Sequence, residues 1–180
     1  KLDFQFDNQN QITGDISIGK IEYSTIINSD TEYIRLNIQN AYNSRIIGEP
    51  ELPQINNLIE IPRGATPYIE IIHDEQIEFD LNTLPNATKI YPAQPSISKS
   101  EIIENQKFII NESSYTKNKN LGFDLVAIEN NGLLREIQIG NLIISPIEYN
   151  PIKNKLIIHK KIEFIVHFNG ADFDLTKQIK

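Results

Sequence analysis

The chain has no cysteine, no methionine and no tryptophan among its 180 residues. Without cysteine, a disulfide, a thiolate metal site and a cysteine nucleophile are all excluded within these residues. The absence of cysteine does not fix the compartment, because exported proteins can also fold without it. Because methionine is absent, we expect that residue 1 is not the initiator, and the lack of a signal peptide is uninformative.

Positive charge is also scarce. The 17 lysines and arginines are outnumbered by 24 aspartates and glutamates, which gives a net charge of -7. A nucleic-acid partner is not expected, because it would require a basic face. No apolar run is long enough to span a bilayer, so we expect no membrane insertion. With 39% hydrophobic and 23% charged residues, the sequence is typical of a globular protein with one core.

Motifs for catalysis, metals and cofactors are missing as well. The sequence has no Gly-rich phosphate loop, no His-Glu-x-x-His pair and no Gly-x-Ser-x-Gly elbow. His73, His159 and His167 fall at no recognised metal spacing. We expect His159 and His167 on neighbouring strands, where they could meet across a ladder or simply lie on a polar face. No catalytic residue, metal or cofactor is therefore expected in this chain.

The sequence does contain many short segments with the pattern of β-strands. Residues 2–7 alternate apolar and polar side chains, which is typical of a half-buried strand, and sustained helical spacing is missing. Further strands are expected at residues 20–27, 32–38, 58–62, 68–72, 76–81, 107–110, 123–129, 133–139, 142–149, 155–159 and 161–168. Turns are expected at 8–11, 13–15, 28–30, 130–132 and 150–154. This pattern predicts an all-β, single-domain antiparallel β-sandwich, similar to a jelly roll, over residues 1–172, with a polar tail at 173–180.

One long irregular region, residues 82–121, interrupts the strands. Loops of this length are uncommon in compact domains and are usually functional or disordered. Pro92 and Pro95 stiffen the part that leads to Lys99. An extended arm that presents one lysine between small serines would suit the cleft of a protease specific for basic residues. The alternative is an ordinary solvated loop lysine, because lysine is almost never buried.

Several blocks of the sequence resemble a known family and occur in the family's order. These blocks are Gly48-x-Pro50-x-x-Pro53, Leu58 through Pro67, Pro92 through Ser100, Pro146 through Pro151 and Leu156 through Asp172. Together they resemble the N-terminal propeptide, or prodomain, of gingipain-type cysteine peptidases, closest to the lysine-specific branch. The resemblance covers most of residues 48–172, whereas residues 1–47 match only in their strand pattern.

The resemblance implies that the domain keeps a following catalytic domain latent and assists its folding. It also implies that a basic residue in a loop at about 92–104 occupies the specificity pocket of the peptidase. Lys99 falls at that position, with Ser98 and Ser100 as small flanks, Ile97 as a secondary anchor and Pro95 as a stiffening residue. An arginine there would indicate the arginine-specific branch.

The partner implied by the resemblance is the cognate gingipain-like catalytic domain in cis, with inhibition in trans left open. The catalytic cysteine and histidine of the family belong to that following domain, so this chain is not an enzyme by itself. The tail at 173–180 would lead to that domain, and Lys177 or Lys180 is a candidate processing site. The resemblance also implies a zymogen exported through the periplasm to the surface of a Gram-negative bacterium, or secreted, as a virulence factor.

A different class of function stays open, because a β-sandwich also suits a glycan- or protein-binding surface module without protease inhibition. Glycan platforms usually expose aromatic side chains on one face. The 7 tyrosines and 8 phenylalanines lie mostly at strand positions, where core packing explains them. A structural spacer domain is the third interpretation.

Overall fold

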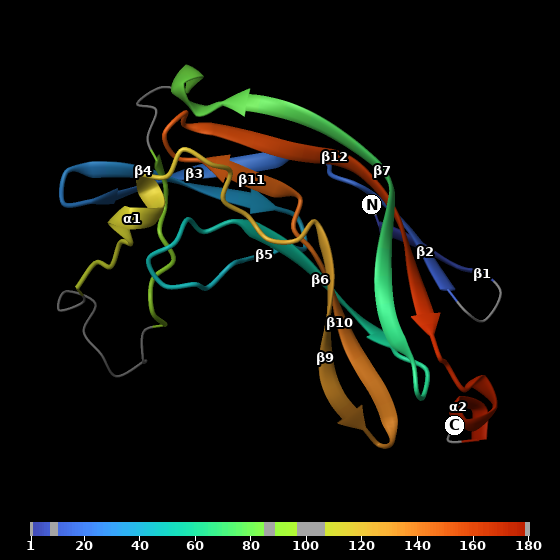
Figure 1. Ribbon diagram of the computed structural model, residues 1–180. Coiled ribbons are helices and arrows are strands. Elements are labelled where there is room, and N and C mark those ends of the chain that lie inside the picture. Colours follow the sequence, from blue (N-terminus) through green and yellow to red (C-terminus); the bar gives the residue numbers. More distant parts are fainter. Residues whose placement is uncertain (1, 8–10, 85–88, 97–106, 179–180) are drawn as a thin grey trace.

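The computed structural model describes residues 2–7, 11–84, 89–96 and 107–178 (Figure 1). Its strands are β1 (Leu2–Asp7), β2 (Gln11–Ser17), β3 (Ile21–Asn28), β4 (Thr31–Ile38), β5 (Tyr42–Asn43), β6 (Pro53–Glu60), β7 (Thr66–Asp80), β8 (Lys89–Ile90), β9 (Val126–Leu134), β10 (Ile137–Ile144), β11 (Ile147–Asn150) and β12 (Lys155–Asn169). The short helices are η1 (Leu81–Thr83), α1 (Glu112–Tyr115) and α2 (Phe173–Gln178). Within these ranges no helix is long and apolar enough to cross a membrane.

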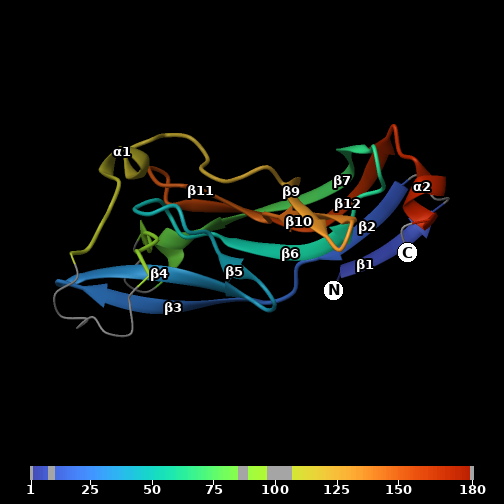
Figure 2. The ribbon, with the colours of Figure 1, turned by 90° about the horizontal axis from the view of Figure 1, so that it is seen from below.

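Strand β12 is the central strand of the largest sheet. It pairs with β7 along its whole length, with β11 near its start and with β2 near its end. Strand β1 extends this sheet beyond β2, while β5-β6-β10-β9 and β3-β4-β8 form two further sheets. All of these pairings are antiparallel except the short one between β4 and β8. Figure 2 shows β3 and β4 on one side of the molecule, with β6 between them and the β7–β12 layer.

The core consists of two apolar clusters between these layers. One joins β2, β6, β10 and the second half of β12, and its largest fully buried side chain is Phe164. The other joins β4, β8, β11 and the first half of β12, and it includes Tyr115 of α1 and Tyr149. The predicted all-β antiparallel architecture is confirmed. Helices α1 and α2 lie at opposite ends of the molecule (Figures 1 and 2).

The turn predicted at residues 13–15 is wrong, because these residues lie inside β2. Gly14 pairs with Phe164 of β12, and the Phe164 ring occupies the space that a Cβ on Gly14 would need. The glycine therefore serves close packing rather than a reversal of the chain.

The two predicted strands at 68–72 and 76–81 are one strand, β7, and those at 155–159 and 161–168 are one strand, β12. Register shifts in their pairing absorb the irregularity between the predicted halves. His159 and His167 therefore lie on the same strand, not on neighbouring ones. Each contacts an acid of β7: His159 Nδ1 lies 2.8 Å from Asp74 Oδ1, and His167 Nε2 lies 2.8 Å from Glu70 Oε2.

The hairpin turn predicted at residues 130–132 is displaced. The β9–β10 reversal occurs at Arg135 and Glu136, which have φ of 48° and 70°. Residues 107–110, predicted as a short strand, are irregular, and residues 173–178 of the predicted polar tail form helix α2. The turns predicted between β3 and β4 and between β11 and β12 are confirmed.

Candidate functional site

The candidate site is the stem, by which we mean the two arms that flank the segment 97–106. The first arm is residues 91–96 and the second is residues 107–111, and the residues that contact them complete the site. In the first arm, Ala93 is hydrogen bonded through its N–H to the Glu49 carbonyl and through its carbonyl to the Gly48 N–H, both at 2.8 Å. Pro50 and Pro92 face one another in an isolated antiparallel bridge. Neither proline has an N–H to lose, so the arm stays extended without an unpaired donor.

The second arm is tied to the same short segment. The N–H of Asn111 donates to the Gly48 carbonyl at 2.9 Å, and its side-chain amide donates to Glu49 Oε1 at 2.6 Å. Ser114 Oγ donates to the same carboxylate oxygen at 2.6 Å. Gly48 has φ +83°, and a Cβ there would lie 3.0 Å from the Asn111 nitrogen. Only glycine fits this position without strain, because both arms converge on it.

The side-chain amide of Gln94 joins the two arms directly. Its Nε2 donates to the Ile109 carbonyl at 2.7 Å, and its Oε1 accepts from the Ile109 N–H at 2.9 Å. The Nε2 group also donates to the Pro92 carbonyl at 3.0 Å. This pair of hydrogen bonds copies the backbone pattern of a β-bridge. It closes the stem between residues that are 15 apart in sequence.

An aromatic cluster packs across the stem. Phe108 of the second arm lies 5.9 Å from Tyr91 of the first, measured between ring centroids, and 5.4 Å from Tyr33 of β4. Tyr33 and Tyr91 meet edge to face at 5.9 Å. Arg35 lies over Tyr91 at 4.8 Å and donates to Glu51 at 2.7 Å. Burial raises the pKa of both tyrosines, so the cluster stays neutral.

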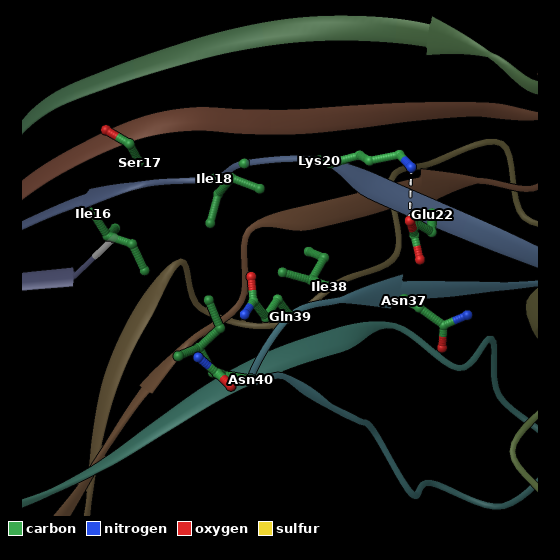
Figure 3. Close-up of a pocket in the computed structure, with 11 residues that line it drawn as sticks. Ile16, Ser17, Ile18, Lys20, Glu22, Asn37, Ile38, Gln39 and Asn40 are labelled. Atoms are coloured by element: carbon green, nitrogen blue, oxygen red, sulfur yellow. Dashed lines mark hydrogen bonds and ion pairs between the residues drawn. The ribbon is translucent and has the colours of Figure 1, made fainter.

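A shallow groove of about 320 Å³ opens beside the stem, lined by Arg35, Arg45, Glu51, Gln94 and Ser96 among others. A second groove of about 760 Å³ lies between the β2–β3 connection and the end of β4 (Figure 3). Its rim carries an exposed ion pair in which Lys20 Nζ lies 2.7 Å from Glu22 Oε1. Among the described residues, none that the sequence predicted as functional lines this second groove.

The family described as Propeptide_C25 matches residues 18–178. The chain belongs to this family. Lys-gingipain of Porphyromonas gingivalis is 30% identical over 169 residues, and Lys-gingipain HG66 is equally identical over the same length. The match covers 94% of this chain but only 10% of either relative. The resemblance to gingipain propeptides is therefore confirmed for a domain that spans a small part of those relatives.

Solved structures give the same assignment. A structure concerned with the zymogenic latency of gingipain K from Porphyromonas gingivalis has a TM-score of 0.87 and 28% identity, and the likeness covers 95% of this chain and 93% of that one. A complex of the pro- and mature domains of Porphyromonas gingivalis RgpB has a TM-score of 0.81 at 16% identity, covering 99% and 95% of the two chains, which shows the shared fold.

Of the residues predicted for the inhibitory loop of this propeptide, Pro95 lies half-buried directly after Gln94. Ile97, Ser98, Lys99 and Ser100 lie outside the described residues. The stem that precedes and follows them is described, and it brings the flanks of the segment together.

One of the two candidate processing sites of the propeptide, Lys177, lies far from this stem. Lys177 is exposed on α2, and Lys180 lies outside the described residues. Helix α2 is at the other end of the molecule from α1 and the stem beside it (Figure 1).

Reasoning from the sequence assigned no role to Glu49, Gln94 or Asn111, and it missed the cluster of Tyr33 with Phe108. These contacts join segments that are distant in sequence, 62 residues apart for Glu49 and Asn111 and 75 for Tyr33 and Phe108, which no local pattern reveals. The length of the irregular region was the available signal, because a long loop in a compact domain needs anchors for its ends.

Proposed function

We propose that this propeptide inhibits a lysine-specific gingipain-like cysteine peptidase by placing Lys99 in the specificity pocket. The closed stem is the observation that carries the proposal. Hydrogen bonds from Gln94 and Asn111 fix the flanks of the segment in which Lys99 lies. The similarity to Lys-gingipains supports lysine as the residue to be recognised.

A fixed stem favours binding for a physical reason. A segment whose flanks are already held loses less conformational entropy when it docks, and this adds affinity without further contacts. A lysine ammonium paired with an acid in a desolvated pocket adds a larger contribution. Removing one partner of such a pair typically costs about 2–5 kcal/mol.

The partner we propose is the catalytic domain that follows the propeptide in the same zymogen, which carries the nucleophilic cysteine. The propeptide contributes no cysteine of its own and would act by occupation of the cleft and by assisting the folding of its partner. Because α2 and the stem lie at opposite ends, a catalytic domain that follows α2 would have to extend along the propeptide to reach the stem (Figure 2). Export through the periplasm to the surface of a Gram-negative bacterium belongs to the same proposal.

The proposal is tested by titrating the purified propeptide against a lysine-specific and an arginine-specific gingipain-type peptidase. Lys99→Ala should weaken inhibition of the lysine-specific enzyme by about 30-fold or more, because about 2 kcal/mol or more of pocket interaction is lost. Lys107→Ala is the matched control, since it removes an exposed lysine at the foot of the second arm. Equal inhibition by the wild type and Lys99→Ala would contradict the assignment of Lys99.

We also propose that the mature peptidase separates from its propeptide by a cut after Lys177 or Lys180. The first turn of α2 is capped by Asp172, whose Oδ1 accepts from the Leu175 N–H at 2.8 Å, and Thr176 Oγ1 accepts from the Arg63 N–H at 2.9 Å. A protease cleaves extended chain, so a cut after Lys177 requires α2 to unwind. Asp172→Ala should therefore speed cleavage at Lys177, as measured by mass spectrometry of the products over time. A boundary at neither lysine would contradict this proposal.

A further inference from the structure

Strand β7 has one long side that no other described strand covers. Among the described residues it pairs only with β12, whereas β12 pairs with β7 on one side and with β2 and β11 on the other. We call the free side of residues 74–80 the β7 edge. Figure 1 shows this part of β7 along the outer margin of the molecule. The backbone hydrogen-bonding groups on such a free side form a template for a further strand.

The β7 edge is apolar on the face that it shares with the core. Ile77 and Phe79 pair with Ile158 and Leu156 of β12, and paired residues point to the same face of a sheet. Ile158 and Leu156 are buried in the second core cluster, but Ile77 and Phe79 remain 44% and 38% exposed. The core therefore ends at this edge in an uncovered apolar row, and an added strand would bury more of it.

The charged side chains of the β7 edge are all acidic. Residues 74–80 contain Asp74, Glu75, Glu78 and Asp80 but no lysine or arginine. The Glu78 side chain is 58% exposed even though its Oε1 lies 2.6 Å from Lys155 Nζ. Glu75 has no ion-pair partner among the described residues. Because opposite charges across a strand pair stabilise it, this edge favours a neighbouring strand that carries positive charge.

The same acids disfavour a second copy of this chain as the neighbour. If two β7 edges paired antiparallel in any register centred between Gln76 and Glu78, at least one acid would lie opposite another. In the register centred on Ile77, for example, Asp74 faces Asp80. Like charges directly opposite one another destabilise a strand pair. The acids thus oppose self-association of an exposed apolar edge and leave that edge open to a basic strand.

We infer that the β7 edge is a docking surface for an extended segment of a partner protein in which apolar residues alternate with lysine or arginine. The segment adds one strand beside β7. Its apolar side chains cover Ile77 and Phe79, and its basic side chains lie beside Glu75 and Glu78. Main-chain hydrogen bonds supply affinity, and the alternation of side chains supplies specificity. This interaction goes beyond the proposed inhibition and does not involve Lys99.

The test measures fluorescence anisotropy of a labelled peptide, acetyl-Lys-Val-Lys-Val-Lys-Val-Lys-amide, with the purified propeptide. A second peptide has proline at its central position, which keeps the charge but removes a backbone donor and interrupts the strand. The first peptide should bind about tenfold more tightly than the second, because it alone completes the main-chain pairing. Equal binding of the two would overturn the inference, since attraction to an acidic protein explains it without a strand. Absence of binding by the first peptide would overturn it as well.

Charge variants of the propeptide locate the binding surface. Glu75→Gln combined with Glu78→Gln removes two acids from the β7 edge and should weaken binding of the alternating peptide about tenfold. Glu22→Gln combined with Glu129→Gln is the matched control, because it removes the same charge from exposed acids on β3 and β9. Thermal unfolding of each variant verifies that the domain stays folded. Equal affinity of the two double variants would contradict the role of the β7 edge.

The apolar face and the backbone are tested separately. Ile77→Thr should weaken binding of the alternating peptide, whereas Ile27→Thr on β3, which alters an equally exposed class of side chain, should not. Peptide binding should also slow hydrogen exchange of the amides in residues 74–80 and leave β3 unchanged. Protection confined to another surface would overturn the inference. A dimer of the free propeptide that Ile77→Lys dissociates would overturn it too, because a second copy would then occupy the edge.

Discussion

Tyr115 joins helix α1 to the start of the first arm through a single hydroxyl group. Its side chain is fully buried, and its hydroxyl donates to the Ile90 carbonyl at 2.7 Å. Ile90 lies in β8, directly before the arm that carries Tyr91 and Gln94. The position of the arm therefore depends on a polar contact inside the core.

Replacing Tyr115 by phenylalanine should destabilise the domain, because it keeps the ring but leaves the Ile90 carbonyl buried without this donor. The expected loss in the free energy of unfolding is about 1–3 kcal/mol, measured by urea denaturation. Tyr68→Phe serves as a control, because Tyr68 is an exposed tyrosine on β7. Equal destabilisation by both variants would contradict the role given to the Tyr115 hydroxyl.

The buried tyrosines also predict a dependence of stability on alkaline pH. Burial raises the pKa of Tyr115 and Tyr149 well above the ordinary value of 10.0. The unfolded chain therefore loses these protons at a lower pH than the folded domain does. Their contribution to stability is complete below about pH 10 and is lost as the pH rises from there toward the folded-state pKa values.

Each such tyrosine adds a slope of up to about 1.4 kcal/mol per pH unit above pH 10. Tyr115→Phe should make the fall in the free energy of unfolding less steep between pH 10 and 11.5, as measured by denaturant titrations across that range. An equal slope in the variant and the wild type would show that Tyr115 ionises alike in both states.

At the scale of elements, β2 and β12 show where local sequence signals succeed and fail. The strand patterns correctly predicted β1, β3 and β4. The same reasoning took Gly14 for a turn residue, because glycine is the commonest signal of a reversal. Its actual reason is the ring of Phe164, which lies on β12 far along the chain. Local patterns carry no information on such distant contacts.

Gly14→Ala should destabilise the domain by roughly 1–3 kcal/mol, because the added methyl group would overlap the Phe164 ring and force it from its place. Gly19→Ala is the matched control, since a Cβ there would meet no atom within 4 Å. Thermal or urea unfolding measures both. A Gly14 variant as stable as the Gly19 variant would show that β12 can shift to make room.

At the scale of the whole molecule, the sequence indicated where in the chain the candidate site would lie. It did not indicate which contacts hold that site in place. The long irregular region and the order of the family blocks drew attention to the segment around Lys99, and the structure describes the stem that flanks this segment. The anchors of that segment could not be predicted, because Gln94 and Asn111 contact Ile109 and Glu49, which are distant from them in sequence. Each of Glu49, Gln94 and Asn111 is an ordinary polar residue in the sequence, and only the hydrogen bonds in the folded domain show that it anchors the stem.

The distance between the stem and α2 was also not predictable from local sequence patterns. The stem and helix α2, which carries Lys177, are separated by most of the length of β12, which the sequence presented as two shorter strands. A continuous strand of 15 residues, and not a hairpin, places α2 at one end of the molecule and the stem at the other.

The central claim is that the residue at position 99 selects the peptidase. Its most direct test is the ratio of inhibition constants for the lysine-specific and arginine-specific enzymes, measured with wild-type propeptide and with Lys99→Arg. The account predicts that the wild type favours the lysine-specific enzyme and that the substitution shifts the ratio about tenfold or more toward the arginine-specific one, because each pocket discriminates the basic group that enters it. An unchanged ratio would contradict the account and place the selectivity on another surface of the propeptide.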